Sequence, residues 1–386
     1  MSKWKTCALA EIGEIVGGAT PSTKDKSNYE NGTISWITPK DLSTHSGRYI
    51  SRGERMITEN GMNSCSTRLL PKNSILFSSR APIGYIAIAQ NEMCTNQGFK
   101  SIIPNSDMDY LFIYYLLLFN KDNIENMGSG TTFKEVSGNT MKSINVSIPE
   151  SIDEQRKIAS ILSSIDDKIE LNNKINENLE LQAQAIYQEM MIDNSSDAWN
   201  KGKLSDIAVI TMGQSPKGDT YNENGIGSVF YQGRAEFSFR FPTRRLFTTE
   251  PKRMAEENDV LMSVRAPVGD LNVATESCCI GRGLAAIHSK DNHQSFVLYT
   301  MYAVKKQLNI FNGEGTVFGS INKDSLNNID ITIPDKDTLD KFEDIVAPMD
   351  AVIRNNYDEN CRLQNIRDSL LPRLMSGEID VSEVKI

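Results

Sequence analysis

Apolar residues recur every three to four positions along residues 148–191, a spacing typical of one face of a helix. Ser151 and Glu154 fit a capping box, in which two side chains bond free backbone N–H groups at a helix start. No proline or glycine follows within this stretch, and five heptads at about 1.5 Å per residue predict a rod roughly 50 Å long. A rod with one apolar stripe needs a partner that buries the stripe.

The same pattern returns over residues 342–370 and predicts a second helix that packs against the first. Asn172 and Asn356 fall on equivalent a positions of the heptad repeat. Buried there, an asparagine costs stability but fixes the register; the alternative is that both are ordinary exposed polar residues. Pro348 removes a helix hydrogen bond and predicts that the second helix is in two pieces.

The predicted seam between the two helices uses the a and d positions of these heptads. Ile158 and Phe342 begin the a columns, Ile161 and Ile345 stand at d, and residues such as Leu162 flank the seam. The predicted helix-pair interface is Ile158, Ile161, Ile165, Asn172, Leu179, Ile186, Phe342, Ile345, Met349, Asn356, Leu363 and Leu370.

Outside the helices, short β-rich runs alternate with Gly and Pro turns, which indicates mixed α/β domains. In the first half we expect strands within residues 34–41, 73–89, 95–103 and 144–149, and a buried helix at 110–119.

Four motifs of the first half recur in the second at one constant offset, the spacing that separates Arg80 from Arg265. A single offset kept over four motifs indicates a tandem duplication. The copies diverge most at residues 22–72 and 217–257, so a common frame carries two different segments, and we expect two sites that do one job on different targets. The motifs are RAPIG (80–84) and RAPVG (265–269), CTNQG (94–98) and CIGRG (279–283), GTTF (130–133) and GTVF (315–318), and Ile-Pro at 148–149 and 333–334.

The sequence therefore predicts an α+β protein, with two tandem-duplicated mixed α/β domains separated by two long antiparallel coiled-coil helices. The expected boundaries are residues 1–150 for the first domain, 151–195 for the central helix, 196–334 for the second domain and 335–386 for the C-terminal helix.

The formal charge of −9 looks unfavourable for a nucleic-acid partner until it is divided by segment. Residues 1–150 carry 15 basic and 14 acidic side chains, and residues 196–334 carry 15 of each. The helices hold the acidity, with 4 basic and 9 acidic side chains in residues 151–195 and 7 and 12 in residues 335–386. The near-neutral domains are compatible with DNA, whereas the helices should avoid phosphate.

Basic residues gather in the two divergent segments. Residues 231–245 alternate as a half-buried strand, with Phe237, Phe239 and Phe241 on one face. Arginine can pair with guanine or contact phosphate, and glutamine can read adenine. Arg80 and Arg265 have an alternative role, because an arginine before a tight Pro-Gly turn can simply hold the turn. The candidate DNA contacts are Ser22, Lys24, Lys40, Arg48, Arg52, Arg55, Arg80, Gln97, Lys100, Thr132, Lys217, Gln232, Arg234, Arg240, Arg244, Arg245, Lys252, Arg253, Arg265 and Arg282.

Catalytic and metal-binding patterns are weak. Six cysteines without a Cys-x-x-Cys pair and only three histidines argue against zinc and against disulfides. Residues 281–286 (GRGLAA) resemble a nucleotide-binding glycine loop but lack a following helix. Asp166 and Asp167 could mimic nuclease carboxylates, although a solvated helix face is the more economical interpretation. We expect no catalytic residue, no metal and no cofactor in this chain.

Membrane and export signals are also missing from the pattern. The longest apolar run, residues 110–119, is short of the roughly 20 residues that a membrane span needs. Residues 1–12 lack a signal-peptide core. A cytoplasmic protein is expected.

Two divergent halves, each ending in Ile-Pro and a long amphipathic helix, resemble the specificity (S) subunits of type I restriction–modification systems. The resemblance covers the whole chain. It is carried by Ile148-Pro149 with residues 154–158 (EQRKI) and Asp166, by the paired Arg-Ala-Pro-x-Gly turns, and by residues 370–379 (LLPRLMSGEI). One departure is residues 337–342 (DTLDKF), which lack the Glu-Gln pair of the first helix.

The resemblance implies that each half is a target-recognition domain that reads one part of a bipartite asymmetric site in double-stranded DNA. It also implies that the helices fix the spacing and dock two methyltransferase (M) subunits, with restriction (R) subunits added to that core. S-adenosylmethionine, ATP and Mg²⁺ would belong to those partners. The alternatives are a specificity subunit of a related system with a fused nuclease–methyltransferase, a stand-alone nuclease acting through Asp166 and Asp167, and a scaffold without DNA contact.

Overall fold

The computed structural model describes residues 3–130, 134–312, 319–382 and 384. The predicted DNA contact Thr132 and residues 315–318 of the repeated GTVF motif lie outside this part of the chain. The chain divides into unit 1, residues 1–173 with 358–386, and unit 2, residues 174–357. Among the described residues, no helix combines the length and apolar character that a membrane crossing requires.

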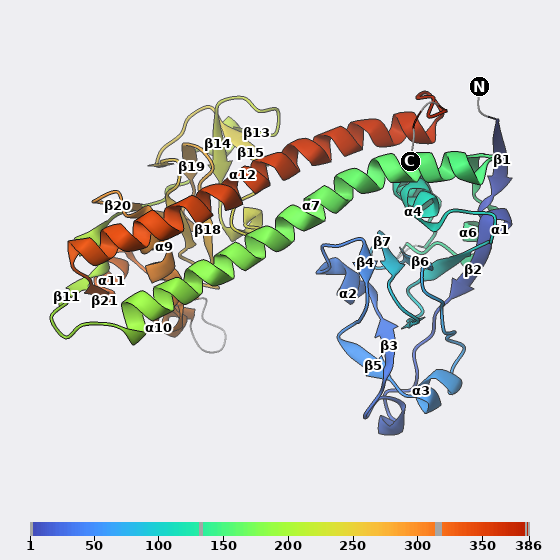
Figure 1. The fold of residues 1–386 in the computed structure, drawn as a ribbon, viewed down its shortest axis with the longest axis horizontal. Helices are drawn as coiled ribbons and strands as arrows, with labels where there is room; N and C mark the ends of the chain where they lie inside the picture. The colour runs from blue at the N-terminus through green and yellow to red at the C-terminus, as the bar shows by residue number, and fades with distance from the viewer. Residues whose placement is uncertain (1–2, 131–133, 313–318, 383, 385–386) are drawn as a thin grey trace. The chain divides into compact units, whose positions relative to one another are not determined.

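Within the described residues, the strands of unit 1 form sheets in the orders β2-β9-β6-β7-β4, β5-β3-β8 and β1-β10. Figure 1 labels the strands β1 to β7. The expected strands are present with two corrections. The strand predicted over residues 34–41 ends at Ile37, because Thr38 and Asp41 form the capping box of a short helix. The strand predicted over residues 95–103 is divided into residues 94–95 and 100–104 by a turn that contains Gln97. The elements are β1 (Trp4–Ala8), α1 (Leu9–Ile12), β2 (Gly13–Gly17), β3 (Ile34–Ile37), α2 (Pro39–Ser43), β4 (Tyr49–Ile50), β5 (Arg55–Ile57), α3 (Glu59–Asn63), β6 (Ile75–Ser79), β7 (Ile83–Ala89), β8 (Cys94–Thr95), β9 (Lys100–Pro104), α4 (Tyr110–Phe119), α5 (Lys121–Asn126), α6 (Gly138–Ser143) and β10 (Asn145–Pro149).

Unit 2 repeats this plan with the orders β12-β20-β17-β18, β13-β15-β14-β19-β16 and β11-β21. The parallel strand pair β14–β19 corresponds to the pair β3–β8 of unit 1. The two copies differ in the strands at the edges of their sheets. The elements are β11 (Asn200–Lys203), α8 (Leu204–Ile207), β12 (Ala208–Met212), β13 (Tyr221–Asn222), β14 (Ser228–Tyr231), β15 (Leu246–Thr248), β16 (Met254–Ala255), β17 (Val260–Ser263), β18 (Leu271–Val273), β19 (Cys278–Ile280), β20 (Leu284–Ser289), α9 (Gln294–Ala303), α10 (Lys305–Leu308), α11 (Lys323–Asn327) and β21 (Asp330–Ile333).

The predicted buried helix is α4, and α9 is its repeat partner in unit 2. Asp109 accepts a 2.9 Å hydrogen bond from the backbone N–H of Phe112 and so caps α4. The fully buried Gln155 also accepts from the backbone N–H of Asp109, at 3.0 Å. In unit 2 the carboxylate of Glu343 takes over this role at the start of α9 and accepts from the backbone N–H of Ser295 at 3.0 Å. Gln155 therefore has an internal task, which explains how the second copy does without the Glu-Gln pair.

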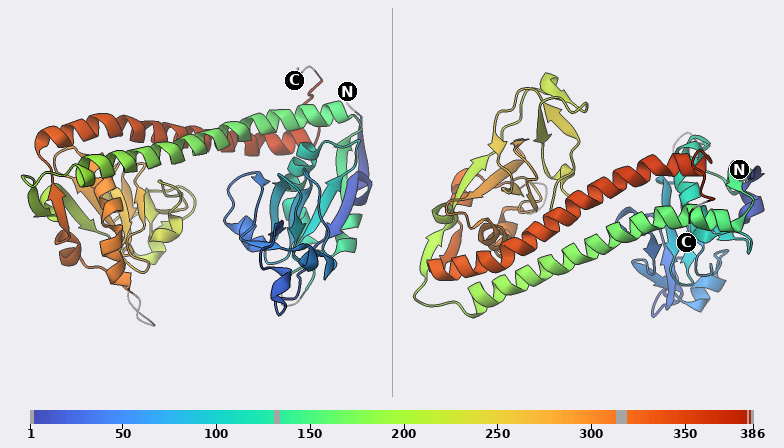
Figure 2. Two further views of the ribbon diagram at one scale, coloured as in Figure 1. Left: turned by 60° about the horizontal axis from the view of Figure 1, so that its bottom comes forward. Right: turned by 45° about the horizontal axis from the view of Figure 1, so that its top comes forward.

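Two long helices run through both units, α7 (Ile152–Tyr187) and α12 (Lys336–Met375). They lie side by side within each unit (Figure 2). α7 begins directly after Ser151 and continues into a π-helical segment, η2 (Gln188–Asp193). The break expected at Pro348 is wrong, because α12 is continuous. Pro348 is exposed, so the hydrogen bond that it removes faces water and costs little packing.

The seam uses a different pair of heptad columns from the predicted one. α7 buries Leu162 and Ile169, and α12 buries Val346 and Ile353, all from the column that the sequence placed beside the seam. The residues predicted at position a are half-buried or buried, and they occupy position d of the observed register. The residues predicted at position d occupy position g of the observed register, at the border of the seam, where Ile345 is 48% exposed. Ile345 is therefore wrong as an interface residue.

The physical reason is that three adjacent columns of each helix are apolar. A sequence with apolar residues at both i+3 and i+4 fits two registers equally well, and the packing of the domain decides between them. Ile161 is only half-buried, and it packs against the hydrophobic core of unit 1 together with Leu370 and Leu374 of α12.

Asparagines occupy core positions of both helices, as predicted for Asn172 and Asn356. In unit 1 the fully buried Asn172 donates from Nδ2 to Asn360 at 2.9 Å and to Glu359 at 2.8 Å. In unit 2 the half-buried Asn356 donates to Asn176 at 2.8 Å. Asn176 and Asn360 are also repeat equivalents, so each predicted asparagine bonds an asparagine that lies one turn further along the other helix.

Candidate nucleic-acid interface

Unit 2 gathers four loops at the carboxyl ends of β14 and β19, which pair in parallel through Tyr231 and Ile280. Backbone hydrogen bonds tie these loops together. The N–H of Gly281 donates to the carbonyl of Tyr231 at 2.8 Å, and that of Gln214 donates to Ile280 at 3.0 Å. The N–H of Val264 donates to Gly283 at 2.9 Å and brings Arg265 alongside. We call residues 213–217, 232–234, 265 and 281–283 loop cluster 2.

Unit 1 builds the same arrangement where β3 and β8 end. The N–H of Asn96 donates to Ile37 at 2.9 Å, that of Ala19 to Thr95 at 3.1 Å, and that of Ser79 to Gly98 at 2.7 Å. Residues 18–22, 38–41, 80 and 96–98 form loop cluster 1. Loops that diverge in sequence therefore start from one backbone frame in both units.

Glycines allow the loops of each cluster to approach this closely. A Cβ atom at Gly18 would lie 2.2 Å from the carbonyl oxygen of Asn96, and one at its equivalent Gly213 would lie 2.1 Å from that of Gly281. Both distances are below any real Cβ contact, so no other residue fits without a backbone shift. The frame is thus fixed by backbone packing rather than by the divergent side chains.

The Arg-Ala-Pro-x-Gly turns are held by serines. Ser78 donates from its hydroxyl to the carbonyl of Pro82 at 2.8 Å and accepts from the N–H of Tyr85 at 2.8 Å. Ser263 does the same with Pro267 at 2.7 Å and Asp270 at 2.9 Å. The alternative in which the arginine holds the turn is therefore not needed. The serines were missed in the sequence, although they are separated by the same constant offset as the repeated motifs.

The structure brings about half of the predicted DNA contacts into the two clusters. Cluster 1 contains Ser22, Lys40, Arg80 and Gln97, with Lys100 two residues beyond it; cluster 2 contains Lys217, Gln232, Arg234, Arg265 and Arg282. All of these are exposed except Arg80 and Lys100, which are half-buried. The remaining exposed candidates lie outside the clusters as defined: Lys24, Arg52, Arg55, Arg244, Arg245, Lys252 and Arg253.

Ion pairs neutralise part of this positive charge. Lys40 pairs with Glu54 at 2.7 Å, and its repeat partner Arg234 pairs with Asp270 at 2.6 Å. Similar pairs join Arg80 and Lys100 to Glu135, Arg244 to Glu276, and Arg245 to Glu236. Arg55 instead stacks its guanidinium over the ring of Tyr29, 4.2 Å from the ring centre.

Arg265 and Arg282 differ from these cations, because neither has an ion pair within the described part of the chain. They line one surface hollow together with Met212 and Ser320. Among the described residues, no carboxylate therefore pairs with either of these two guanidinium groups of cluster 2.

Arg48 is wrong as a DNA contact, because its side chain is buried against α7 and only 5% exposed. Its Nε donates to Glu170 at 2.9 Å, it also pairs with Asp167, and its Nη1 lies 3.5 Å from the hydroxyl of Tyr115. Burial alone disfavours the charged guanidinium, but hydrogen bonds to Glu170 and Asp167 outweigh it and raise the pKa of Arg48. The arginine anchors the divergent segment to the helix.

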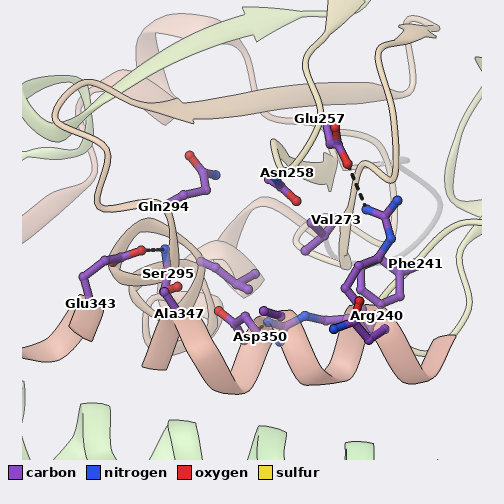
Figure 3. A pocket seen from close by; sticks show the side chains of 14 residues that line it. Arg240, Phe241, Glu257, Asn258, Val273, Gln294, Ser295, Glu343, Ala347 and Asp350 are labelled. Carbon is purple, nitrogen blue, oxygen red and sulfur yellow. Dashed lines mark hydrogen bonds and ion pairs between the residues drawn. The ribbon is translucent and has the colours of Figure 1, made fainter. Parts of the chain in front are cut away.

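Arg240 is wrong for the same reason, being 4% exposed. It pairs with Asp350 of α12 and, at 3.3 Å, with Glu180 of α7, and the hydroxyl of Tyr299 lies 3.4 Å away. Figure 3 shows Asp350 projecting from α12 toward Arg240, at the edge of a hollow of about 370 Å³ that Phe241 also lines. Burial disfavours the charged guanidinium, but the combined electrostatic attraction of Asp350, Glu180 and the neighbouring tyrosines outweighs it and raises the pKa of Arg240.

The strand predicted over residues 231–245 is also wrong. β14 ends at Tyr231, a 3-10 turn follows at η4 (Arg234–Glu236), and Arg240 has a positive φ of 65°. Phe239 is 46% exposed, whereas Phe241 is buried. The alternating pattern was produced by a loop that folds back so that Arg240 can reach the helices.

A buried tyrosine–aspartate pair in each unit was missed in the sequence. Tyr115 donates to Asp166 at 2.7 Å, and Tyr299 donates to Asp350 at 2.9 Å. The two tyrosines are separated by the same number of positions as the two aspartates, a signal that was present. Asp166 also accepts from Arg367 at 2.8 Å. The carboxylates considered for a nuclease are therefore engaged in holding the helices.

Comparison with known proteins agrees with this architecture. The family model for the type I restriction modification DNA specificity domain matches residues 1–181 and again residues 196–365. Two matches in one chain fit two copies of a recognition fold, each with its own loop cluster. The chain belongs to the type I restriction–modification DNA specificity family.

Individual relatives support the assignment. The chain is 33% identical to the type I restriction enzyme MjaIX specificity subunit of Methanocaldococcus jannaschii, covering 99% of this chain and 94% of that one. It is 34% identical to the EcoR124I/EcoR124II specificity subunit of Escherichia coli over 46% of this chain and 43% of that one. A crystal structure of the type I S subunit from M. genitalium shares the fold with a TM-score of 0.62, at 16% identity, over 97% and 96% of the two chains.

Proposed function

We propose that this chain is the DNA-specificity subunit of a type I restriction–modification complex, and that each unit reads one part of a bipartite asymmetric site through its loop cluster. The observation that carries the proposal is the duplicated frame. Clusters 1 and 2 share glycine-packed backbones but present different exposed side chains. Membership of the specificity family and the names of the relatives support the same role.

The charge distribution favours DNA contact through the domains. Cluster 2 gathers the exposed Lys217, Arg234, Arg265 and Arg282, and cluster 1 presents the exposed Lys40 and the half-buried Arg80. Both lie on units whose domains are near neutral, whereas residues 151–195 carry 9 acidic against 4 basic side chains. Lysine and arginine near phosphate release counterions and give affinity that depends on salt. A scaffold without DNA contact would need no such cluster.

We further propose that the subunit is not itself catalytic and acts in the cytoplasm. Two methyltransferase subunits would dock on α7 and α12, and restriction subunits would join that core. S-adenosylmethionine, ATP and Mg²⁺ would be bound by those partners. Asp166 and Asp167 are consistent with a non-catalytic role, because their carboxylates already bind Tyr115, Arg367 and Arg48. The relatives' names favour a type I system over one with a fused nuclease–methyltransferase.

The continuous helices α7 and α12 would set the number of base pairs between the two half-sites. One heptad inserted into each helix adds about 10 Å, or roughly 3 base pairs. The same insertion in α7 alone is the control, because it breaks the seam with α12.

Methylation mapping tests the proposal. The chain is expressed with its methyltransferase subunit in a methylation-free host, and the genome is sequenced for modified bases. We expect one split asymmetric motif, which disappears when the chain is left out. A continuous motif, or no DNA modification by a correctly assembled complex, would contradict the function.

A further inference from the structure

Gln97 and Arg282 occupy the same place in the two loop clusters. They are separated by the constant offset of the repeated motifs, and each follows its strand, β8 or β19, at the second position after the strand ends. Both loops leave their sheets beside a parallel neighbour, since β8 pairs with β3 and β19 pairs with β14. One backbone position therefore carries a glutamine in unit 1 and an arginine in unit 2.

The backbone around this position is packed so closely that it exposes few other side chains. A Cβ atom at Gly281 or Gly283 would lie 2.8 or 2.9 Å from the carbonyl oxygen of Gln232. In unit 1 the N–H of Gly98 is held by the side chain of Asn96 at 2.8 Å, and a Cβ atom at Gly98 would lie 2.9 Å from Pro39. Because residues on both sides are fixed, the side chains of Gln97 and Arg282 leave the frame from a rigid base and are exposed.

The chemistry at this position suits base edges better than phosphate in unit 1. Glutamine is neutral and gains little from phosphate, whereas its amide can donate to N7 and accept from N6 of adenine. The hydroxyl of Thr20 bonds Oε1 of Gln97 and orients the amide. One acceptor lone pair and both N–H donors of the amide have no partner among the residues that the structure describes. The amide of Gln97 is therefore pre-organised and exposed to solvent.

Arg282 offers the matching arrangement for guanine. Arginine donates two parallel hydrogen bonds to O6 and N7 of guanine. The neighbouring cation of this cluster, Arg234, is tied to Asp270, whereas Arg282 has no ion pair within the described residues. Its backbone N–H is fixed by the hydroxyl of Ser215 at 3.3 Å. The guanidinium fork is therefore available, and its base is anchored.

We infer that residues 97 and 282 are equivalent base-reading positions, with Gln97 reading an adenine in one half-site and Arg282 reading a guanine in the other. The inference rests on the proposed function and adds two specificity-determining residues to it. Arg265 lies on the turn held by Ser263 and lines the same hollow as Arg282. We assign it a contact with the DNA backbone, which would strengthen binding to every sequence alike.

The test uses the complete methyltransferase complex with this chain, either as the parent or with Gln97→Arg or Arg282→Gln. Methylation motifs are mapped, and binding is measured to duplexes substituted at each position of the motif. We expect Gln97→Arg to replace adenine by guanine at one position of one half-site, and Arg282→Gln to do the reverse in the other half-site. Discrimination at that position should change roughly 10- to 100-fold, with the other half-site unaltered.

Three further variants keep the outcome clear. If an exchange abolishes binding, Gln97→Ala and Arg282→Ala should relax the preference at the same single positions. Arg265→Gln should weaken binding to all sequences and leave the motif unchanged. The inference would be overturned if the Gln97 and Arg282 variants kept the parental motif and bound all sequences more weakly by the same factor. In that case a split motif in the parent would still support the proposed function. A parent without a split motif would overturn the function itself.

Discussion

The hydroxyl of Tyr115 donates a 2.7 Å hydrogen bond to Asp166 Oδ2, and both residues are almost completely buried. Tyr299 and Asp350 make the equivalent bond at 2.9 Å in unit 2. Each tyrosine belongs to a domain helix and each aspartate to a long helix, so the pair joins the domain to the helices within its unit. The duplication has kept this contact while the loops around it diverged.

Replacing Tyr115 by phenylalanine leaves the carboxylate of Asp166 with one partner fewer in a buried setting. We expect the free energy of unfolding to fall by about 1–3 kcal/mol, as for other buried groups that lose a hydrogen bond. Burial, followed by the charge of Asp166, raises the pKa of Tyr115. The hydroxyl therefore stays protonated, and the loss should not vary across neutral pH. Urea unfolding at several pH values measures it.

Tyr85→Phe is the matched control, because the described residues give the Tyr85 hydroxyl no hydrogen-bond partner. Its effect on the free energy of unfolding should be close to zero. Equal losses in Tyr115→Phe and Tyr85→Phe would show that the bond to Asp166 contributes nothing beyond the loss of a hydroxyl group.

Arg240→Met should be among the most destabilising single changes in unit 2. The variant leaves Asp350 and Glu180, only 20% and 16% exposed, without their cation, and breaking such a buried pair costs about 3–5 kcal/mol. Arg48→Met should cost less, because its partners Asp167 and Glu170 are 67% and 26% exposed and water can replace the guanidinium, above all at Asp167. Thermal or urea unfolding of the two variants gives the comparison.

Lys40→Met provides the surface reference, since Lys40 and Glu54 are both highly exposed and such solvated pairs contribute little to the free energy of unfolding. Adding Asp350→Leu to Arg240→Met removes the stranded carboxylate and should recover part of the loss. A variant Arg240→Met as stable as Lys40→Met would mean that water reaches the Asp350 site and that the arginine is not an anchor.

The sequence predicted the duplication and the helices well because these depend on local periodicity and on one constant offset. α4 has the predicted bounds, and the strands around the Arg-Ala-Pro turns are present where they were expected. The seam was displaced by one column, since Ile345 and Val346 are both apolar and only the packed domain decides which is buried.

The candidate site was harder to predict, because a side chain's charge does not reveal its partner. Arg48 and Arg240 lie in the divergent segments and looked like DNA contacts, yet both return to acidic residues on the helices. Those acids are distant in sequence, and no periodicity links them to the arginines. Gln97 and Arg282 lie in repeated motifs, so the sequence shows that they are equivalent positions. It placed Gln97 within a strand, however, and the structure puts this residue in the turn after β8.

The six cysteines should differ in reactivity in the folded protein. Burial raises the pKa of the Cys94 thiol to about 11 and that of Cys278 to about 12, and the thiolate is the reactive form. Cys65 and Cys361 are only half-buried. We expect iodoacetamide to label Cys65 and Cys361 in the native protein and the other four cysteines only after unfolding in urea. Peptide mass spectrometry reads out each site, and labelling of Cys278 as rapid as that of Cys361 would show that β19 opens in the native state.

The asparagine pair at the seam should fix the register at a cost in stability. Asn172 is fully buried, and its Oδ1 has no hydrogen-bond partner in the described part of the chain, so the pair with Asn360 is only partly satisfied. Replacing both by leucine should raise the free energy of unfolding by about 1 kcal/mol or more, because two buried amides become apolar contacts. Asn360→Leu alone should lower it, since Asn172 then loses an acceptor. The double-mutant cycle, measured by urea unfolding, gives the coupling between the two amides.

The double variant should also tolerate sliding of one helix along the other, because an apolar seam fits several registers. A disulfide designed for the parental register should then form more slowly in the double variant than in the parent. Equal rates of disulfide formation would assign the register to the domain contacts at Tyr115 and Asp166 and leave the asparagines without that role.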